Sequence, residues 1–307
     1  MKKVLIMLST YNGEKFLREQ LDSLYAQEGV NIHILVRDDG SKDKTIEILK
    51  EYQSLRGNMS ISAEPNIGAA LSFHTLISYA VKEIQNYDYF AYADQDDVWM
   101  SDKLCSAVGQ LEKSVAKSKL YFCMPELVDS ELRSLPSRKV RVGNNLKGNI
   151  VTNHILGCTQ VFNGYLLDLI SMYYPNPANH RVPLHDAWTA LVAYAFNSDV
   201  IVDSRQYIKY RQHGNNVVGS SKNFFEAQKA RITRYINGQS IKSNKCKLIL
   251  DIYSNILDEN NKDVLMKCAS YKENFNSKMN MLFDREYYQY DLITNIGAFL
   301  MILFNKF

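Results

Sequence analysis

The stretch YFAYADQDDVW, residues Tyr89–Trp99, ends an apolar, aromatic-rich run in three carboxylates within four positions. The run is typical of a buried strand, and Asp94, Asp96 and Asp97 follow it directly. Carboxylates this close repel one another and raise one another's pKa unless a positive charge lies between them. Because one divalent cation satisfies several carboxylates at once, the stretch predicts a metal site at the end of a buried strand.

Strand-like and helix-like segments alternate along the first part of the chain. Continuous apolar runs mark the strands, and apolar residues at helical spacing mark the segments between them. The predicted strands are Val4–Leu8, Asn31–Arg37, Met59–Ala63 and the run that ends at Ala93, and the predicted helices between them are Glu14–Gln27, Asp43–Leu55 and Asn66–Ile84. Such alternation predicts an α/β fold with a Rossmann-like, mostly parallel sheet flanked by helices.

Polar clusters follow three of these strands: Ser9–Asn12 (STYN), Arg37–Ser41 (RDDGS) and Asp94–Asp97 (DQDD). In open α/β sheets, ligands bind in the crevice outside the carboxyl ends of the strands. We therefore expect the three clusters to converge at one edge of the sheet and to form one site. A dinucleotide-binding dehydrogenase is disfavoured, because no GxGxxG sequence follows the first strand.

The alternation loosens after Leu120, and the pattern is helical beyond Asn223. The predicted strands in this part are Lys119–Cys123, His154–Phe162, Val200–Asp203 and Tyr207–Tyr210, and the predicted helices are Ala187–Phe196, Phe224–Ile236, Ile241–Asp258 and Lys262–Phe275. This organisation predicts one α/β domain over residues 1–220 and a helical C-terminal extension over residues 221–307.

Composition places the chain among ordinary globular proteins, since 46% of its residues are apolar and 22% are charged. Its five cysteines are odd in number and share no CxxC spacing. This favours reduced thiols in a cytoplasmic protein and disfavours a zinc site. No segment reaches the roughly 18 apolar residues that a transmembrane helix needs. We expect neither a membrane-spanning segment nor a nucleic-acid partner.

The C-terminal third is basic and ends in an apolar tail. Between Arg205 and Arg285 there are 15 Lys/Arg against 7 Asp/Glu. Solvated helix surfaces explain this excess, and so does attraction to an anionic membrane or a phosphorylated substrate. Ile296–Phe304 is nearly all apolar, too short to span a bilayer and long enough to lie in its interface. Two interpretations stay open: the tail packs on the core or on a second subunit, as in a homodimer, or it attaches the protein peripherally to the inner face of the cell membrane.

Several known arrangements of acidic residues bear on Asp94–Asp97. An EF-hand loop would need glycine and glutamate where Trp99 and Cys105 stand, so it is excluded. The DxDxT/V motif of phosphotransferases with an aspartyl nucleophile matches Asp94–Val98. In those enzymes, however, the motif follows the first strand, whereas here it follows a later one. A DxD motif holds Mn²⁺ or Mg²⁺ against the diphosphate of a nucleotide sugar. Capping of the following helix by these carboxylates is the purely structural interpretation.

Six motifs in order bear on this choice: STYNG, RDDGSKDKT, PNIGAA, YADQDDVWMSDKL, LHDAW and YRQHGNN. Together they resemble the family 2 glycosyltransferases, which have a GT-A fold. The resemblance implies a nucleotide-binding half over residues 1–105 and an acceptor and catalytic half over residues 106–220. The combination of DQDDVW with QHGNN is most similar to the bacterial branch that transfers rhamnose from dTDP-L-rhamnose in polysaccharide assembly.

The resemblance implies a donor site along the ends of the strands. Tyr11 is expected to stack on the base, and Asp39 to accept the N3–H of a pyrimidine. Asp96 is implied as the direct ligand of Mn²⁺ or Mg²⁺, and Asp94 is a further candidate ligand. His213 suits either the metal or the diphosphate. Arg211 is expected to clamp the diphosphate, because a guanidinium presents a bidentate fork to phosphate oxygens. The complete set of implied nucleotide-binding residues is Thr10, Tyr11, Asn12, Asp39, Asn66, Gly68 and Asp94.

Asp186 is the candidate catalytic base. An inverting transfer needs a carboxylate on the face opposite the leaving diphosphate, to take the proton of the acceptor hydroxyl. The family places this Asp at the start of a helix. His185-Asp186 before AWTALVAYAF fits, although the common form has Glu or Gly where this chain has His. Capping of the helix by Asp186 is the structural alternative, and it is compatible with catalysis.

These residues predict an inverting, metal-dependent glycosyltransferase. The expected donor is dTDP-L-rhamnose, with a UDP-hexose as the alternative. The expected acceptor is a surface polysaccharide or a lipid-linked glycan. A metal-dependent phosphotransferase and a catalytically silent nucleotide-sugar-binding subunit stay open as interpretations from other classes.

Overall fold

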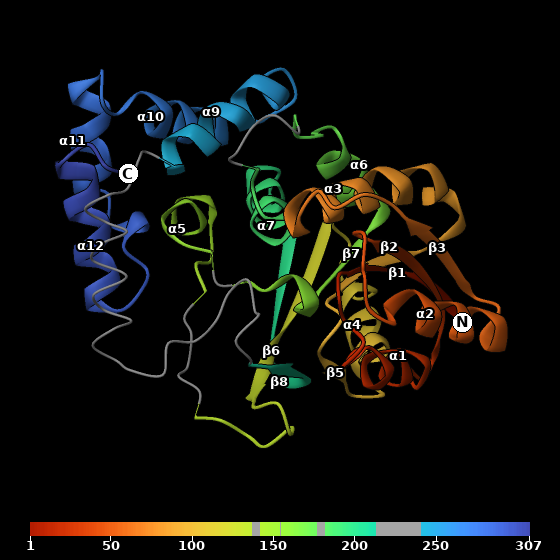
Figure 1. Cartoon of the computed structure of the whole chain (residues 1–307). Helices are drawn as coiled ribbons and strands as arrows, with labels where there is room; N and C mark the ends of the chain where they lie inside the picture. Colours follow the sequence, from red (N-terminus) through yellow and green to blue (C-terminus); the bar gives the residue numbers. More distant parts are fainter. Residues whose placement is uncertain (137–141, 154, 177–181, 213–240) are drawn as a thin grey trace. The chain divides into compact units, whose positions relative to one another are not determined.

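The computed structural model describes residues 1–136, 142–153, 155–176, 182–212 and 241–307 (Figure 1). The chain forms two compact units that are interleaved along the sequence. Unit 1 comprises Met1–Ser137, Ile155–Thr189 and Asn197–His213, and unit 2 comprises Arg138–His154, Ala190–Phe196 and Gly214–Phe307. The division at residue 220 stays a prediction, because the compact units divide the chain at several points, of which only the last lies near it.

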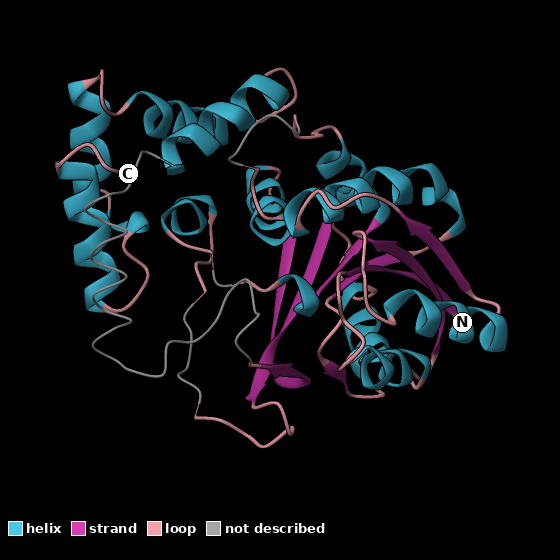
Figure 2. Ribbon diagram, in the orientation of Figure 1, coloured by secondary structure: helices cyan, strands magenta, loops and turns pink. Residues whose placement is uncertain are grey.

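The described part of unit 1 contains one sheet of eight strands, in the order β3-β2-β1-β4-β7-β6-β8-β5. Figure 2 shows these strands in magenta. Their bounds are Lys2–Thr10 (β1), Val30–Asp38 (β2), Met59–Ala63 (β3), Tyr89–Ala93 (β4), Val98–Trp99 (β5), Lys119–Val128 (β6), Gln160–Asn163 (β7) and Asp199–Arg211 (β8). The α/β fold expected from the sequence is confirmed.

Strands β2, β1 and β4 run parallel and end at the same edge of the sheet. Thr10 at the end of β1 lies opposite Asp38 at the end of β2, and Leu8 lies opposite Ala93, the last residue of β4. The polar residues that follow these strands therefore start from neighbouring positions, as the sequence predicts. Beyond β4 the sheet is mixed, because β7 is antiparallel to β4 and β6, and β5 is antiparallel to β8.

Helices cover both faces of this sheet (Figure 1). Strand β1 is buried on both sides, as is usual for parallel strands in α/β proteins, and Val4, Ile6 and Leu8 point into one core. The helices that complete that core are α1 (Leu17–Tyr25), α2 (Thr45–Arg56) and α4 (Lys103–Leu111). The opposite face carries α3 (Ala69–Ala80), which continues into the 3-10 helix η1 (Val81–Asn86), and α6 (Gly164–Ser171).

Three predicted strands beyond residue 150 differ from the observed ones. The predicted strand His154–Phe162 is confined to β7, because Gly157–Thr159 forms a 3-10 turn (η2) immediately before it. The predicted strands at 200–203 and 207–210 are one continuous strand, β8. Its pairing with β6 shifts register on both sides of Met124. A β-bulge of this kind absorbs extra residues without ending the strand.

Unit 2 is helical in its described residues. Its elements are α5 (Leu146–Val151), α9 (Ile241–Tyr253), α10 (Glu259–Ser270), α11 (Phe275–Phe283), the 3-10 helix η3 (Arg285–Tyr287) and α12 (Leu292–Leu303), and α7 (His185–Ala195) begins in unit 1 and ends in unit 2. The helices predicted to begin at Ile241 and Lys262 are confirmed as α9 and α10, with shifted ends. The predicted helix Phe224–Ile236 and His154 lie outside the described residues. None of the described helices combines the length and the apolar character needed to cross a membrane.

Candidate active site

The loop between β4 and β5 carries the three carboxylates of the quoted stretch. Asp97 is fully buried, whereas Asp94 and Asp96 are partly exposed. Burial, together with the charges of Asp96 and Asp186, raises the pKa of Asp94 to about 7. Burial and the charges of Asp94 and Asp96 likewise raise the pKa of Asp97 well above its usual range. The crowding of negative charge expected from the sequence is therefore present in the folded chain.

The fold brings Asp186, the candidate base, to this acidic loop. It stands in the first turn of α7, and its charge acts on Asp94. Its main-chain carbonyl accepts a hydrogen bond from Gln160 Nε2 at 3.1 Å, and its Oδ1 accepts the N–H of Ala187 at 2.5 Å. Carboxylates from two distant parts of the chain thus meet at one place. His213, the other residue predicted to reach the metal, lies outside the described residues.

Cys158 belongs to this cluster, although the sequence analysis assigned it no role there. The ligand atoms of Asp94, Asp97 and Cys158 all lie within 4.8 Å of one another. Burial, with the charges of Asp97 and Asp94, raises the pKa of the Cys158 thiol well above its usual range. The side chain is therefore a neutral thiol beside the carboxylates. A lone cysteine in an apolar segment gives no signal from which this position could be found.

Lys103 supplies a buried positive charge beside the acidic loop. Its side chain is fully buried, and its Nζ lies 3.3 Å from the centroid of the Trp99 ring, in a cation–π contact. Burial lowers the pKa of Lys103 to about 8, while the nearby Cys123, Cys158 and Asp97 act in the opposite direction. Nothing in the sequence marks this residue, which stands at the start of an ordinary amphipathic helix.

Gln95 fixes the loop after β1 to the acidic loop. Its amide accepts the N–H of Tyr11 at 2.8 Å and donates to the Tyr11 carbonyl at 3.0 Å. Gly13 leaves room for this contact, because a Cβ there would lie 2.3 Å from Gln95 Oε1. Asn12 turns the loop with a φ of 46° and accepts the N–H of Lys42 at 2.9 Å. Tyr11 is 46% exposed, and its stacking on a base stays a prediction.

Asp38 serves the turn after β2. Its carboxylate accepts hydrogen bonds from Thr10 Oγ1 at 2.9 Å, from the Ser41 N–H at 2.9 Å and from Ser41 Oγ at 2.6 Å. Thr10 is only 1% exposed, so its hydroxyl is used inside the protein. A contact between Thr10 and a nucleotide stays a prediction, and the observed role of both side chains is to shape the loop.

Asp39 joins the end of β2 to the segment before α3. Its Oδ1 accepts Arg37 Nη1 at 2.5 Å and the Ile67 N–H at 2.8 Å, and its Oδ2 accepts the Gly68 N–H at 2.8 Å. Asn66 Nδ2 donates to the Asp39 carbonyl at 3.0 Å. A carboxylate offers about four acceptor positions. By this count one position on Oδ2 stays open, on a residue that is only 2% exposed, and the pyrimidine contact that the resemblance implies stays a prediction.

Gly68 starts α3 in a backbone conformation that favours glycine, with a φ of 83°. Nothing lies within 4 Å of the position that a Cβ would take, so the space beside this residue is open. The backbone of Gly68 can consequently be approached by a ligand. The sequence predicts that this helix begins at Asn66, but the conformation of Gly68 delays its start to Ala69.

Arg211 holds the acidic loop in place. It is 1% exposed, its Nε donates to the Asp96 carbonyl at 2.8 Å, and its main-chain N–H donates to Asp97 Oδ1 at 3.1 Å. Its guanidinium also donates to the Ser130 carbonyl and to Glu19 Oε2, each at 2.5 Å. The fork of this side chain is thus engaged inside the protein. A clamp on a diphosphate stays a prediction, and it would require these bonds to be replaced.

His185 packs the start of α7 against the sheet. Its ring stacks on Phe73 with the centroids 3.7 Å apart and meets Tyr92 edge-on at 4.6 Å. Burial lowers the pKa of His185 well below its usual range, so the ring is neutral. Gly157 makes room for it, since a Cβ there would lie 2.3 Å from Nε2. This packing explains how a histidine is accommodated directly before Asp186.

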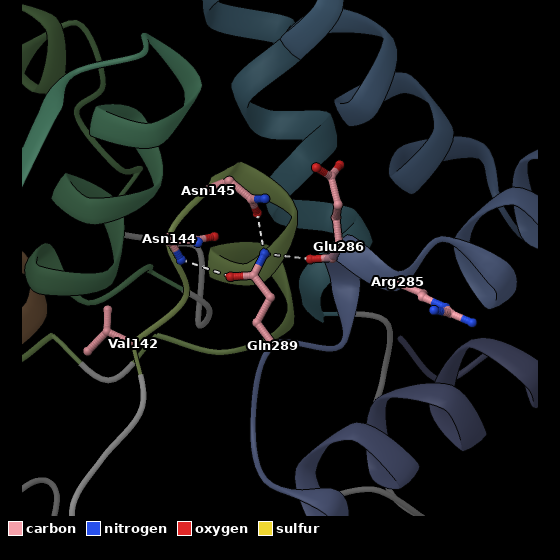
Figure 3. A pocket seen from close by; sticks show the side chains of 6 residues that line it. All are labelled: Val142, Asn144, Asn145, Arg285, Glu286 and Gln289. Atoms are coloured by element: carbon pink, nitrogen blue, oxygen red, sulfur yellow. Dashed lines mark hydrogen bonds between the residues drawn. The ribbon is translucent and has the colours of Figure 1, made fainter.

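A separate hollow lies in unit 2, and Figure 3 shows its lining side chains. Gln289 joins its two sides, because its Oε1 accepts the Asn144 N–H at 2.8 Å and its Nε2 donates to Asn145 Oδ1 at 2.7 Å. These bonds hold the start of α5 to the segment after η3. The hollow has a volume of about 610 Å³ and is lined by Val142, Asn144, Asn145, Arg285, Glu286 and Gln289, none of which belongs to the acidic cluster.

The mixed sheet and its acidic edge are those of a GT-A type fold. The chain belongs to glycosyl transferase family 2, whose family model matches residues 5–171. The dTDP-rhamnosyl transferase RfbG of Shigella flexneri is 30% identical to it over 228 residues, which cover 71% of this chain and 75% of the relative. An uncharacterized glycosyltransferase of Haemophilus influenzae is 25% identical over 277 residues, 84% of this chain and 82% of the relative.

Solved structures share this fold. The crystal structure of S. aureus TarS 1-349 has a TM-score of 0.58 and 20% identity, covering 98% of this chain and 80% of that chain. The same protein in complex with UDP-GlcNAc gives a TM-score of 0.57 at 18% identity, covering 98% and 90%. The mannosyltransferase PcManGT of Pyrobaculum calidifontis, in complex with GDP-Man and Mn²⁺, gives 0.52 at 15% identity, covering 99% and 88%. At these identities the likeness shows the fold alone.

Proposed function

We propose that this family 2 glycosyltransferase is inverting and metal-dependent, and that it moves L-rhamnose from dTDP-L-rhamnose to a surface polysaccharide or a lipid-linked glycan. The observation that carries the proposal is that Asp186, in the first turn of α7, stands near enough to Asp94 for its charge to raise the pKa of that carboxyl. Inversion needs carboxylates in two roles, one beside the cation and the diphosphate and one beside the acceptor. The similarity to the Shigella dTDP-rhamnosyl transferase supports the donor.

The acidic loop offers a donor set that suits Mn²⁺ or Mg²⁺. Asp94 and Asp96 provide hard carboxylate oxygens, and no nitrogen or oxygen donor among the described residues reaches the buried Oδ2 of Asp97. Burial first, and neighbouring carboxylates second, raise the pKa of Asp94 and Asp97, and a bound cation would favour their charged forms. Asp96, together with Asp94, would hold the ion. When bound, the ion would neutralise charge that develops on the leaving diphosphate.

Asp186 would accept the proton of the acceptor hydroxyl as the new bond forms. The hydroxyl oxygen attacks the anomeric carbon from the face opposite the diphosphate, and the diphosphate leaves with the bonding electrons, which inverts the configuration. The hydrogen bond from Gln160 and the stacking of His185 on Phe73 fix the first turn of α7, and with it the carboxylate. Positioned bases of this kind contribute roughly 10²–10⁴-fold to the rate.

The nucleotide would lie over the loop after β1 and beside Gly68. Tyr11 offers an exposed ring, and the remaining acceptor position of Asp39 suits the N3–H of a pyrimidine. The open space at Gly68 lets the ligand approach the backbone. Thymine and uracil both carry N3–H, so a UDP-hexose is the second candidate donor. The structural neighbour TarS was crystallised with UDP-GlcNAc, which is a UDP-sugar, but its likeness to this chain shows the fold alone.

Calorimetric titration with dTDP and UDP, with and without Mn²⁺, tests the nucleotide and the metal. We expect dTDP to bind in the presence of Mn²⁺ and more tightly than UDP. This binding should be lost in Asp96→Asn and retained in the matched control Asp102→Asn, which changes an exposed carboxylate next to α4. Transfer from dTDP-L-rhamnose to a membrane extract that contains lipid-linked glycans should follow the same pattern.

Each other outcome corrects a different part of the proposal. A preference for UDP would replace the donor and keep the metal site. Binding that does not depend on Mn²⁺, or that survives Asp96→Asn, would contradict the metal assignment. The absence of any nucleotide binding by the folded protein would overturn the donor site as a whole.

A further inference from the structure

Helix α12 (Leu292–Leu303) has two opposite sides, and the described parts of the chain cover only one of them. The covered residues are Thr294, Gly297, Ala298, Met301 and Ile302. The other side, which we call the exposed α12 face, consists of Leu292, Ile293, Ile296, Phe299, Leu300, Leu303 and Phe304, each between 36% and 75% exposed. With about 3.6 residues per turn, this second set falls on the side of the helix opposite the first.

The exposed α12 face is larger than an incidental apolar patch. Its seven large apolar residues are on average about half exposed, which at about 200 Å² per residue leaves roughly 700 Å². The largest apolar patch of a typical monomer covers about 300–600 Å². A standard protein–protein interface buries about 800 Å² on each partner. The face therefore has the size of one half of a dimer interface.

Contacts within unit 2 fix this helix at both ends. Asp291 caps the N-terminus by accepting the Thr294 N–H at 3.1 Å. At the C-terminus, Lys278 Nζ donates to the Leu303 carbonyl at 2.7 Å and to Asn305 Oδ1 at 3.0 Å. The helix also packs against α11. The exposed α12 face is thus presented by a helix that is already ordered, which lowers the entropic cost of binding a partner.

The charges around the face favour a protein partner over an anionic membrane. No charged residue stands between Asp291 and Lys306, and residues 241–307 carry nine Lys/Arg against eight Asp/Glu. The basic excess counted over residues 205–285 is therefore not concentrated here. A helix that lies on a membrane carries Lys and Arg opposite its apolar side, whereas the opposite side of α12 is covered and uncharged. Charge depletion with exposed phenylalanines is typical of the core of a homodimer interface.

We propose that the exposed α12 face binds the same face of a second copy of this chain. Pairing about a two-fold axis matches two surfaces that are equally apolar, equally uncharged and equal in area. Ile296, Leu300 and Leu303 lie along the middle of the face and form its core, with Leu292 and Phe304 towards its ends. The proposal involves none of the residues assigned to the donor or the metal, so it stands or falls independently of the proposed function.

Sedimentation velocity on the full chain tests this pairing. We expect a dimer at micromolar concentration, and a monomer for the double variant Ile296→Lys/Leu303→Lys, because dimerisation would bury unpaired charges. Its dissociation constant should rise at least about 100-fold. The matched control Leu55→Lys changes a leucine of α2 that is 72% exposed, and it should leave the dimer intact. Circular dichroism checks that the variants fold, and Ile296→Ser/Leu303→Ser is a milder second variant, expected to weaken the dimer about tenfold.

Three results would overturn the proposal. A wild-type chain that stays monomeric throughout the micromolar range does not use the face for pairing. A dimer that survives in the folded double variants has its interface elsewhere. A monomer that co-sediments with phosphatidylglycerol vesicles, and loses this property in the double variant, uses the exposed α12 face to bind a membrane surface.

Discussion

Two acidic loops follow the strands on either side of β1, and they handle their negative charge in opposite ways. After β2, Asp38 and Asp39 each accept three hydrogen bonds from within the protein. After β4, burial and neighbouring carboxylates raise the pKa of Asp94 and Asp97. The carboxylates of the first loop are hydrogen-bonded within the protein, whereas those of the second lie beside one another, as the proposed cation site requires.

The difference teaches that an acidic pair after a strand does not by itself indicate a metal site. The Arg37 guanidinium and the N–H groups of Ile67 and Gly68 converge on Asp39 and balance its charge. The charged groups that act on Asp94 are other carboxylates, one of them Asp186 from α7. The supply of donors, which depends on tertiary contacts, therefore decides whether such a loop serves structure or chemistry.

Replacement of Asp186 by Asn should have the largest effect on activity. We expect sugar transfer to slow roughly 10²–10⁴-fold, because an amide cannot take the proton of the acceptor hydroxyl. Single-turnover transfer and calorimetric binding of dTDP measure chemistry and donor binding separately, and dTDP binding should be unchanged. The control Asp168→Asn removes an exposed carboxylate of α6 and should leave both unchanged. A normal rate in Asp186→Asn would contradict the assignment of the base.

Asp39→Asn should be the most destabilising change among the acidic residues. It leaves the Arg37 guanidinium, which is 1% exposed, without its closest counter-charge, and breaking a buried ion pair costs roughly 3–5 kcal/mol. Asp96→Asn, at a partly exposed carboxylate of the second loop, should change the free energy of unfolding by no more than about 0.5 kcal/mol. Urea denaturation of both variants in a metal-free buffer measures the contrast. Equal losses would erase the distinction between the two loops.

The stability of the metal-free protein should depend on pH through Asp94. The folded chain keeps this carboxyl protonated up to a pKa of about 7, whereas the unfolded chain ionises it near pH 4. The folded state binds more protons in this window, so the contribution of Asp94 to the free energy of unfolding falls as the pH rises through it. The free energy of unfolding of the wild type, minus that of Asp94→Asn, should fall by on the order of a few kcal/mol from pH 4 to pH 8.

Chemical denaturation at several pH values, with a chelator present, measures this difference. Subtraction of the Asp94→Asn curve removes the contributions of His74, His185 and Lys103, whose pKa values are also shifted. Addition of Mn²⁺ should flatten the dependence. If the free energy of unfolding of the wild type minus that of the variant stays constant or rises with pH, the pKa of Asp94 is not raised in the folded chain, and the contrast between the two loops is wrong.

Two glycines provide the finest comparison. A Cβ would meet nothing within 4 Å at Gly68 or at Gly109, but only Gly68 has a positive φ. Gly68→Ala should cost about 1–2 kcal/mol of stability, because L side chains disfavour this conformation. Gly109→Ala in α4 should be neutral or stabilise by up to about 1 kcal/mol. If thermal unfolding shows no difference between the variants, the conformation at the start of α3 is not constrained as described.

Most of the sheet and the location of its acidic edge were predictable, because they depend on local patterns. The apolar runs of β1, β2 and β4 each end in polar residues, and parallel strands bring such ends together. Asp186 was placed at the start of a helix because the apolar segment after it has the right length and the sequence resembles a known family. The positions of Cys158 and Lys103 beside Asp97 were not predictable, since nothing in their own segments indicates these contacts.

Arg211 shows that the chemistry of a side chain does not by itself predict its partners in the fold. Its guanidinium is suited to a diphosphate, yet in the fold it binds the Asp96 carbonyl, Ser130 and Glu19. These three partners come from three segments, all far from Arg211 in the sequence. No pattern within a short window encodes such a meeting, so only the coordinates reveal that the side chain is buried and occupied.

Local sequence patterns were enough to predict the alternation of strands and helices up to β4, the family and the presence of acid after β4, because periodicity, turn residues and motifs are properties of neighbouring residues. Only the tertiary structure shows which of the carboxylates after β2 and β4 receive hydrogen bonds and which lie beside other carboxylates. A hydrogen bond needs its donor within about 3 Å of the acceptor, and the donors on Asp39 and the carboxylates around Asp94 arrive from segments far along the chain.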